Sequence, residues 1–144
     1  MKTACRLALA TIVVLLAGGC ATSGPKFTEF SAVLGPIPAD AGRIYVYRLV
    51  IAGAAVQPEV RLNGEVVGRA VPMGFFYVDK KPGDYELEAT TEVTRKLSFT
   101  LEQGQQRYVR LNISMGFFVG HVYPELVDDD VAQKEIQNCR YLRR

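Results

Sequence analysis

The chain has 144 residues, of which 17 are Lys or Arg and 15 are Asp or Glu, with three cysteines, one histidine and no tryptophan. This length suits one domain with room for a hydrophobic core. Without Lys2 and Arg6 at the N-terminus, 15 basic residues balance 15 acidic ones. The balance excludes nucleic acid as an expected partner, because nucleic-acid binding requires a concentrated basic surface.

The first twenty residues, MKTACRLALATIVVLLAGGC, have the pattern of an export signal. Lys2 and Arg6 precede an uncharged run over residues 7–19, which is shorter than the roughly 20 residues that cross a bilayer. This stretch resembles a bacterial lipobox, although Ala17 stands where leucine is commonest. The resemblance implies a signal peptide over residues 1–19 and lipid attachment at Cys20. An ordinary secretory signal and an uncleaved anchor are the alternatives.

The residue after the cysteine indicates a destination. Ala21, by resemblance to the sorting rules of Gram-negative lipoproteins, favours transfer to the outer membrane. We therefore expect a lipid-anchored protein that faces the periplasm, with the membrane as a partner through Cys20. Once Cys5 has left with the signal and Cys20 carries lipid, Cys139 has no intramolecular disulfide partner. Cys139 is then either a buried thiol or a residue for intermolecular disulfide or redox chemistry.

Residues 20–42 are rich in small and polar residues and are interrupted by Pro and Gly. Such a composition predicts a flexible tether that lifts the domain from the membrane. Phe27, Phe30 and the Val33-Leu34 pair give part of it apolar side chains for docking onto the domain.

From residue 43 the apolar residues recur with the period of two that is typical of strands, and residues 43–144 are expected to form one domain. Asn63-Gly64 between two such segments predicts a hairpin, and turns are expected at residues 81–84 and 102–105. Strands about every ten residues predict a mainly β fold, an antiparallel β-sandwich of about seven strands. The predicted strands include RIYVYRLV (43–50), the arms of VRLNGEVVG (60–68), and segments around Leu87, Phe99 and Leu111.

The C-terminal segment has a helical pattern. Asp128, Asp129 and Asp130 suit the positive end of a helix dipole, and arginines lie at the other end. The acidic triplet lacks the interleaved Gly and distal Glu of a calcium loop, so a helix start is the expected role. The apolar stripe predicts one helix that continues to the last of its members, which are Ala132, Ile136, Cys139 and Leu142.

Five segments in this order resemble a known family: GRIYVYR, RLNGEVVG, FFYVDKKPGDYELEA, LEQGQQRYVRLNI and EIQNCRYL. They look like the bacterial domain-of-unknown-function family numbered 2846, often found in lipoproteins, over residues 42–142. More distantly, the pattern is similar to prealbumin-like, Ig-like and carboxypeptidase-regulatory-like sandwich domains. The resemblance implies a sandwich fold and an envelope location, and it supplies no catalytic residue.

The sequence indicates neither an enzyme nor a cofactor site. The one histidine, His121, has no neighbouring pattern of nucleophile or metal ligands, so we expect no catalytic residue and no metal site. We expect a non-catalytic structural module or a module that binds an envelope protein. The alternative is a module for a small ligand or glycan, using tyrosines such as Tyr45, Tyr47, Tyr77 and Tyr108.

The tetrapeptide MGFF occurs twice, ending in Phe75-Phe76 and in Phe117-Phe118. Its flanks differ, so it is not a duplicated unit. Adjacent strand residues point to opposite faces, so each pair is expected to place one ring in the core and one on the outer face. The C-terminal helix is expected to cover at least one outer ring, with Gly74 or Gly116 allowing close approach. Any of these four phenylalanines that stays uncovered would be the candidate partner surface.

Overall fold

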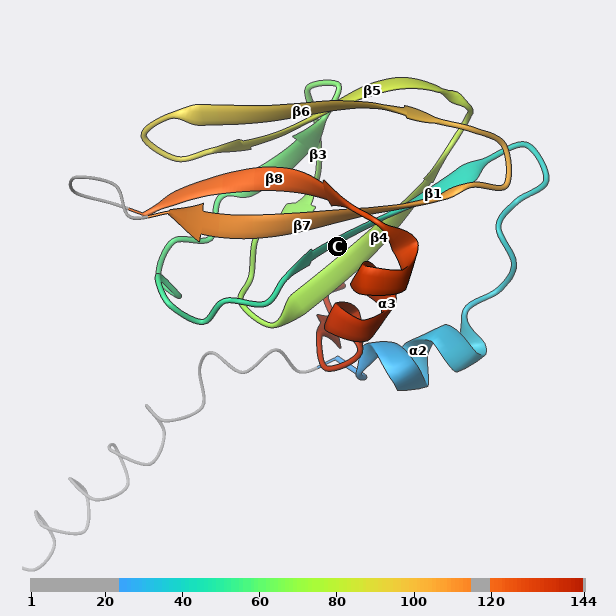
Figure 1. The fold of residues 1–144 in the computed structure, drawn as a ribbon, viewed down its shortest axis with the longest axis horizontal. Coiled ribbons are helices and arrows are strands. Elements are labelled where there is room, and N and C mark those ends of the chain that lie inside the picture. The colour runs from blue at the N-terminus through green and yellow to red at the C-terminus, as the bar shows by residue number, and fades with distance from the viewer. Residues whose placement is uncertain (1–23, 115–119, 144) are drawn as a thin grey trace, which may run out of the picture.

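The computed structural model describes residues 24–114 and 120–143, so the signal segment and Cys20 lie outside the described residues. Two β-sheets stack face to face, and two short helices lie against the outer side of one of them (Figure 1). The helices are α2 (Phe27–Val33) and α3 (Asp129–Ile136). The strands are β1 (Gly42–Arg48), β2 (Glu59–Leu62), β3 (Glu65–Arg69), β4 (Gly74–Lys80), β5 (Gly83–Thr90), β6 (Thr94–Leu101), β7 (Gln106–Ser114), β8 (His121–Val127) and β9 (Arg140–Tyr141).

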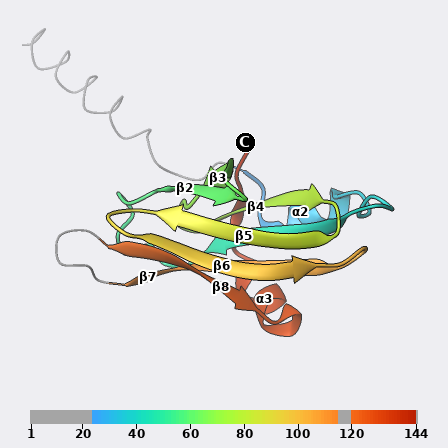
Figure 2. The same cartoon turned by 90° about the horizontal axis from the view of Figure 1, so that it is seen from above.

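The five-stranded sheet has the order β8-β7-β1-β4-β9, and the four-stranded sheet has the order β3-β2-β5-β6. Seen from above, β5 and β6 lie over β7 and β8 (Figure 2). The expected mainly β fold with two sheets is confirmed. The expected count of seven strands is wrong, since the described residues contain nine. β8 carries Pro124 and β9 has two residues, so neither gives a long alternating pattern.

The pairing is also less uniform than an antiparallel sandwich. β1 runs parallel to β7, with Tyr45 opposite Tyr108, and β9 runs parallel to β4. Strands that pair in parallel need a long connection. Between β1 and β7, for example, the chain crosses to the other sheet and returns. Local alternation predicts strands but carries no signal for such pairings.

Two of the three predicted turns lie where the sequence places them, whereas the segment 81–84 contains only a two-residue connection, because β4 ends at Lys80 and β5 begins at Gly83. Asn63 and Gly64 have φ values of 48° and 81°, which are both positive as a type I′ hairpin turn requires. The turn predicted at residues 102–105 contains Gly104 at φ 70°, where glycine avoids the steric cost of a Cβ atom. These two turns join β2 to β3 and β6 to β7.

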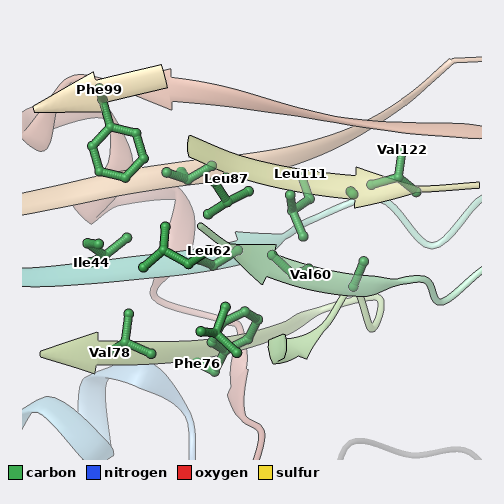
Figure 3. Close-up of a cluster of buried hydrophobic side chains, with 14 of the residues drawn as sticks. Ile44, Val60, Leu62, Phe76, Val78, Leu87, Phe99, Leu111 and Val122 are labelled. Atoms are coloured by element: carbon green, nitrogen blue, oxygen red, sulfur yellow. The ribbon is translucent and has the colours of Figure 1, made fainter. Parts of the chain in front are cut away.

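The main core lies between the two sheets. It consists of aliphatic side chains from both inner faces together with the ring of Phe99 and the ring of Phe76 (Figure 3). Gly68 lies against the ring of Phe76, since a Cβ atom there would be 2.6 Å from it. Burial of such side chains is the dominant stabilising contribution to the fold. The labelled members are Ile44, Val60, Leu62, Phe76, Val78, Leu87, Phe99, Leu111 and Val122.

A second apolar cluster covers the outer face of the five-stranded sheet. All seven residues of β1 are buried, so this strand is covered on both faces. α2 and α3 supply the cover on the outer side (Figure 1), and Tyr141 of the edge strand β9 packs on the same cluster. The buried members of the outer cluster are Tyr45, Tyr47, Phe75, Tyr108, Ala132, Ile136 and Cys139.

The two ends of the domain agree with the sequence expectations only in part. Phe27 and Phe30, in the tether expected over residues 20–42, pack on the outer cluster as the sequence suggested, but the helix α2 that carries them was not expected. The expected C-terminal helix ends at Ile136, so Cys139 and Leu142 lie beyond it. The helix begins as predicted, with Asp128 as N-cap and Asp129 and Asp130 in its first turn. Because the chain then turns into β9, Arg140 is not a partner of the helix dipole.

Candidate functional site

The first MGFF segment divides its rings between the two clusters. Phe76 points into the inter-sheet core and Phe75 into the outer cluster, and both side chains are buried. Neither ring therefore offers a surface to a partner. The second segment, with Phe117 and Phe118, lies outside the described residues, as does Cys20.

The cover over Phe75 comes mainly from elements other than the expected helix. Its aromatic neighbours are Phe27 and Phe30 of α2 and Tyr141 of β9, with ring centroids 5.2, 5.7 and 5.6 Å away. α3 contributes to the same cluster through Ala132 and Ile136. The outer face is thus closed by segments from both ends of the described chain.

Gly74 permits a close approach, but of the segment after the C-terminal helix and not of the helix itself, which was the expectation. A Cβ atom at Gly74 would lie 2.7 Å from Cδ1 of Leu142, which is closer than real side-chain contacts allow. The backbone amide of Leu142 donates to the carbonyl of Phe75 at 2.8 Å. Glycine therefore lets the C-terminal segment run directly against the start of β4.

A cleft of about 470 Å³ opens between α2 and α3. Its floor is the edge of a stacked pair, Tyr45 and Tyr108, with ring centroids 4.9 Å apart and planes at 11°. Its walls carry neutral polar side chains. The volume of the cleft is within the range of small-ligand sites. These polar side chains are Thr28, Ser31, Gln106, Gln133 and Gln137.

One charged residue, Arg43, lines this cleft, and its charge is already neutralised. Its Nε and Nη2 donate to the two carboxylate oxygens of Asp79 at 2.6 and 2.8 Å, and its Nη1 donates to the carbonyl of Gly35 at 3.1 Å. The hydrogen bonds to Asp79 raise the pKa of Arg43 above its ordinary value. The cleft therefore offers hydrogen bonds without net charge.

Three of the four tyrosines proposed for sugar stacking serve as packing instead, and the fourth, Tyr77, is partly buried with the Arg43 guanidinium 4.8 Å from its ring centroid. Tyr45 and Tyr108 are 4% and 2% exposed, and Tyr47 is buried as well. Burial raises the pKa of the Tyr108 phenol to about 12. A sugar ring stacks on an exposed aromatic face, and these three rings present none. The cleft can recognise a ligand through amides and hydroxyls.

A second feature is the loop after β1, which surrounds a fully buried arginine. Arg48 donates to five backbone carbonyls, those of Val50, Ala52, Gly53, Val56 and Ala70, at distances of 2.7 to 3.1 Å. No carboxylate of the described residues pairs with this guanidinium, and burial lowers its pKa. Burying a charge is costly unless it is fully hydrogen-bonded. The five carbonyls meet that need, and the four that belong to the loop after β1 fix it around the arginine.

The loop held by Arg48 presents apolar side chains to solvent. Val50 is 39% and Ile51 66% exposed, although both belong to a loop whose backbone is fixed. The loop lies beside the β7–β8 end of the sandwich, because Gly53 faces Ile113. The β5–β6 turn reaches the same end through a 3.3 Å hydrogen bond between Thr91 and His121, and it carries the exposed Val93. We call Val50, Ile51 and Val93 the loop-end surface.

A charged network attaches α3 to the five-stranded sheet. Tyr47 donates to Oε2 of Glu135 at 2.6 Å, and Nη1 of Arg110 donates to Oε1 of the same carboxylate at 2.5 Å. Nη2 of Arg110 donates to Glu125 at 2.8 Å. Burial and Glu135 raise the pKa of Tyr47, while Arg110 and Asn112 lower that of Glu125. Each of these side chains has a partner, although Nε of Arg110 is buried without one, and the network holds the helix in place.

The described residues assemble no catalytic or metal constellation. His121 bonds to the hydroxyl of Thr91, and no described carboxylate joins this pair. No group of three metal-ligating side chains occurs among residues 24–114 and 120–143. Cys139 is a free, buried thiol whose pKa burial raises to about 12. No described helix has the length and hydrophobicity to cross a membrane.

The sequence contained a signal for Arg48 that the prediction overlooked. In RIYVYRLV, both Arg43 and Arg48 interrupt an otherwise apolar strand, and a strand buried on both faces leaves no room for an unpaired charge. Two charges in such a strand indicate buried partners. Their partners, the Asp79 carboxylate and five loop carbonyls, are set by tertiary structure and could not be named from spacing.

Comparison with protein families gives one match, and no curated protein matches the sequence. The matching family is described as a protein of unknown function (DUF2846), and its profile covers residues 38–122. The match contains β1 to β7, which make up most of both sheets, and ends at the start of β8. It does not extend to EIQNCRYL, which the sequence resemblance had included. Because the matched range is more than half of the chain, the protein belongs to the DUF2846 family.

Proposed function

We propose that the protein is a lipid-anchored domain on the periplasmic side of the outer membrane and that it acts without catalysis, by binding an envelope protein. The anchor is supported by the charged and apolar segments, the small residues before Cys20 and Ala21 after it. A sandwich whose outer face is closed by both chain ends is a stable support for such a role.

The loop-end surface carries the binding role. A flexible loop loses conformational entropy when it becomes ordered against a partner, which weakens binding. A loop that is already fixed in its bound conformation avoids this loss. Arg48 fixes the loop through four hydrogen bonds to its backbone carbonyls, yet Ile51 remains the most exposed apolar side chain of this surface. An exposed apolar side chain on a rigid loop fits an apolar recess on a protein partner.

Site-specific crosslinking tests this binding role. A photoreactive amino acid at position 51, in cells that export the full chain, is expected to give one discrete crosslinked product. The matched control is position 66, since Val66 is also exposed but lies on β3, away from the loop-end surface. The product at position 51 should disappear in the Val50→Asp variant. Equal products from positions 51 and 66, or none from position 51, would reject this surface.

The cleft between α2 and α3 favours a second candidate, a small neutral ligand rich in hydroxyl or amide groups. The amides of Gln106, Gln133 and Gln137 and the hydroxyl of Ser31 face a cleft without net charge. NMR titration with a neutral envelope disaccharide, such as one of N-acetylated amino sugars, is the test. Saturable shifts confined to cleft residues and lost in Gln133→Ala would support it. Shifts that also appear on β6 would show nonspecific binding.

A further inference from the structure

The described chain is attached to the domain from its first residue. Nη1 of Arg140 donates to the carbonyl of Gly24 at 3.0 Å, and the amide of Tyr141 donates to the carbonyl of Pro25 at 2.9 Å. Lys26 forms an isolated bridge with Arg140, and the amide of Phe27 donates to the carbonyl of Cys139 at 2.9 Å. α2 follows directly, with Phe27 in the outer cluster. Residues 24–27 are therefore part of the folded domain.

This attachment limits the distance between the domain and a lipid at Cys20. Three residues, Ala21 to Ser23, separate Cys20 from Gly24. A residue spans at most about 3.6 Å, so the four steps from Cys20 to Gly24 reach at most about 14 Å. Stacked sheets lie about 10 Å apart, and a helix layer adds about 10 Å more. The outer face of the four-stranded sheet is thus further from Gly24 than this connection extends.

The surface around Gly24 has the charge that suits phospholipid. Lys26, Arg140 and Arg143 lie on or beside the paired segments 24–26 and 140–143, and Arg143 is exposed. One carboxylate, that of Glu29, lies at the same place, where it accepts a hydrogen bond from the backbone amide of Lys26 at 3.1 Å. These three basic side chains outnumber the Glu29 carboxylate, so the surface has a positive charge that attracts lipid phosphates. We call segments 24–26 and 140–143 the anchor-side surface.

We infer that the anchor-side surface lies against the bilayer and that its basic side chains bind phospholipid phosphates. The inference rests on the proposed lipidation of Cys20, and it adds an orientation to it. The anchor keeps the domain at the membrane with α2 and β9 toward the lipid. The outer face of the four-stranded sheet, which carries Glu86, Glu88 and Lys96, faces away.

Fluorescence quenching measures this orientation. The full lipoprotein, extracted from membranes and placed in phospholipid vesicles, carries one dye at Thr28→Cys or at Ser98→Cys. Both positions are exposed hydroxyl residues, one on α2 and one on the outer face of β6. Cys20 is blocked by its thioether, and the buried Cys139 does not compete for the dye. Lipids with a nitroxide headgroup should quench the dye at position 28 several-fold more than the dye at position 98.

The short connection to Cys20 and the basic side chains can be tested separately, each with its own variant. A flexible insert of about ten Gly and Ser residues between Ser23 and Gly24 lengthens the reach and should reduce the difference between the two dyes. Arg143→Glu should weaken quenching at position 28 in vesicles that contain phosphatidylglycerol, whereas Arg95→Glu on β6 should not. Quenching that is unchanged in Arg143→Glu would reject the phosphate contact.

Failure of the inferred orientation and failure of the proposed anchor give different results. Equal quenching at positions 28 and 98 in protein whose intact mass includes the lipid would reject the orientation and leave the anchor standing. A mature mass without lipid at Cys20 would reject the proposed anchor, and the inferred orientation with it.

Discussion

The ring of Phe27 packs edge-on against the ring of Phe75, with centroids 5.2 Å apart and planes at 77°. Edge-to-face pairs add to the stabilisation that apolar burial already provides. The contact joins α2 to β4 of the five-stranded sheet, and it covers the MGFF ring that points away from the core. A segment with the composition of a tether thus stabilises the domain.

We expect Phe27→Ala to lower the free energy of unfolding by about 2 kcal/mol. Removing a core phenylalanine costs roughly 3–5 kcal/mol, and Phe27 is only partly buried. Denaturant unfolding of the soluble domain measures the change. Thr28→Ala, at the exposed neighbouring position, should change stability by less than about 0.5 kcal/mol. Equal values for the two variants would show that α2 does not support the sheet.

Arg48→Met should destabilise the protein by about 3 kcal/mol or more, because buried carbonyls lose their donors at about 1–3 kcal/mol each. Hydrogen exchange over residues 49–58 should become faster in the variant under conditions where the sheets remain folded. Arg61→Met removes an exposed arginine that pairs with Glu59, so its effect should be within about 1 kcal/mol. Unchanged exchange in Arg48→Met would mean that the guanidinium does not organise the loop.

Gly74→Ala should destabilise the protein by about 1–3 kcal/mol, the usual cost of overpacking. The added Cβ atom would lie 2.7 Å from Leu142. Combining Gly74→Ala with Leu142→Ala should cost less than the sum of the two single changes, because the smaller side chain makes room. Gly35→Ala is the control, since nothing lies within 4 Å of its Cβ position. Additive effects would show that the two residues do not meet.

Stability should fall as the pH rises above about 9. An unfolded cysteine ionises near pH 8.5, whereas burial raises the pKa of Cys139 to about 12, and the buried tyrosines add to the effect above about pH 10. An unfolded tyrosine ionises near pH 10, whereas burial raises the pKa of Tyr108 to about 12. In this interval the unfolded chain releases a proton that the folded protein retains, so alkali favours unfolding. The pKa values of Tyr45 and Tyr47 are raised as well, which gives the same direction. Unfolding free energies at pH 8, 10 and 11 measure the slope, which should be smaller in Tyr108→Phe and unchanged in Tyr123→Phe, at an exposed position.

The local parts of the fold were readable from the sequence. Period-two alternation located the strands, and Asn63-Gly64 located a hairpin, because both signals depend on neighbouring residues. The start of α3 followed from the acidic triplet for the same reason. Its end did not, since the apolar stripe continues through Cys139 and Leu142, of which Cys139 is buried and Leu142 partly buried by packing beyond the helix.

The remaining parts depend on contacts between distant residues. α2 has seven residues and little intrinsic helix stability, so it exists through the contacts of Phe27 and Phe30 with β4 and β9. The parallel pairing of β1 with β7 and the cleft between α2 and α3 follow from the same assembly. The alternation of Phe75 and Phe76 between two faces was predictable, but the identity of the cover was not.

The two arginines of β1 have a consequence for strand register. Arg43 lies on the face of Tyr45 and Tyr47, and Arg48 lies on the face of Ile44 and Val46. A shift by one residue would exchange the two faces and move each guanidinium away from its hydrogen-bond acceptors. A shift by two would keep the faces but separate Arg43 from Asp79 and Arg48 from its carbonyls. The central strand therefore has a single acceptable alignment, because each of its ends carries a charge that only one position can satisfy.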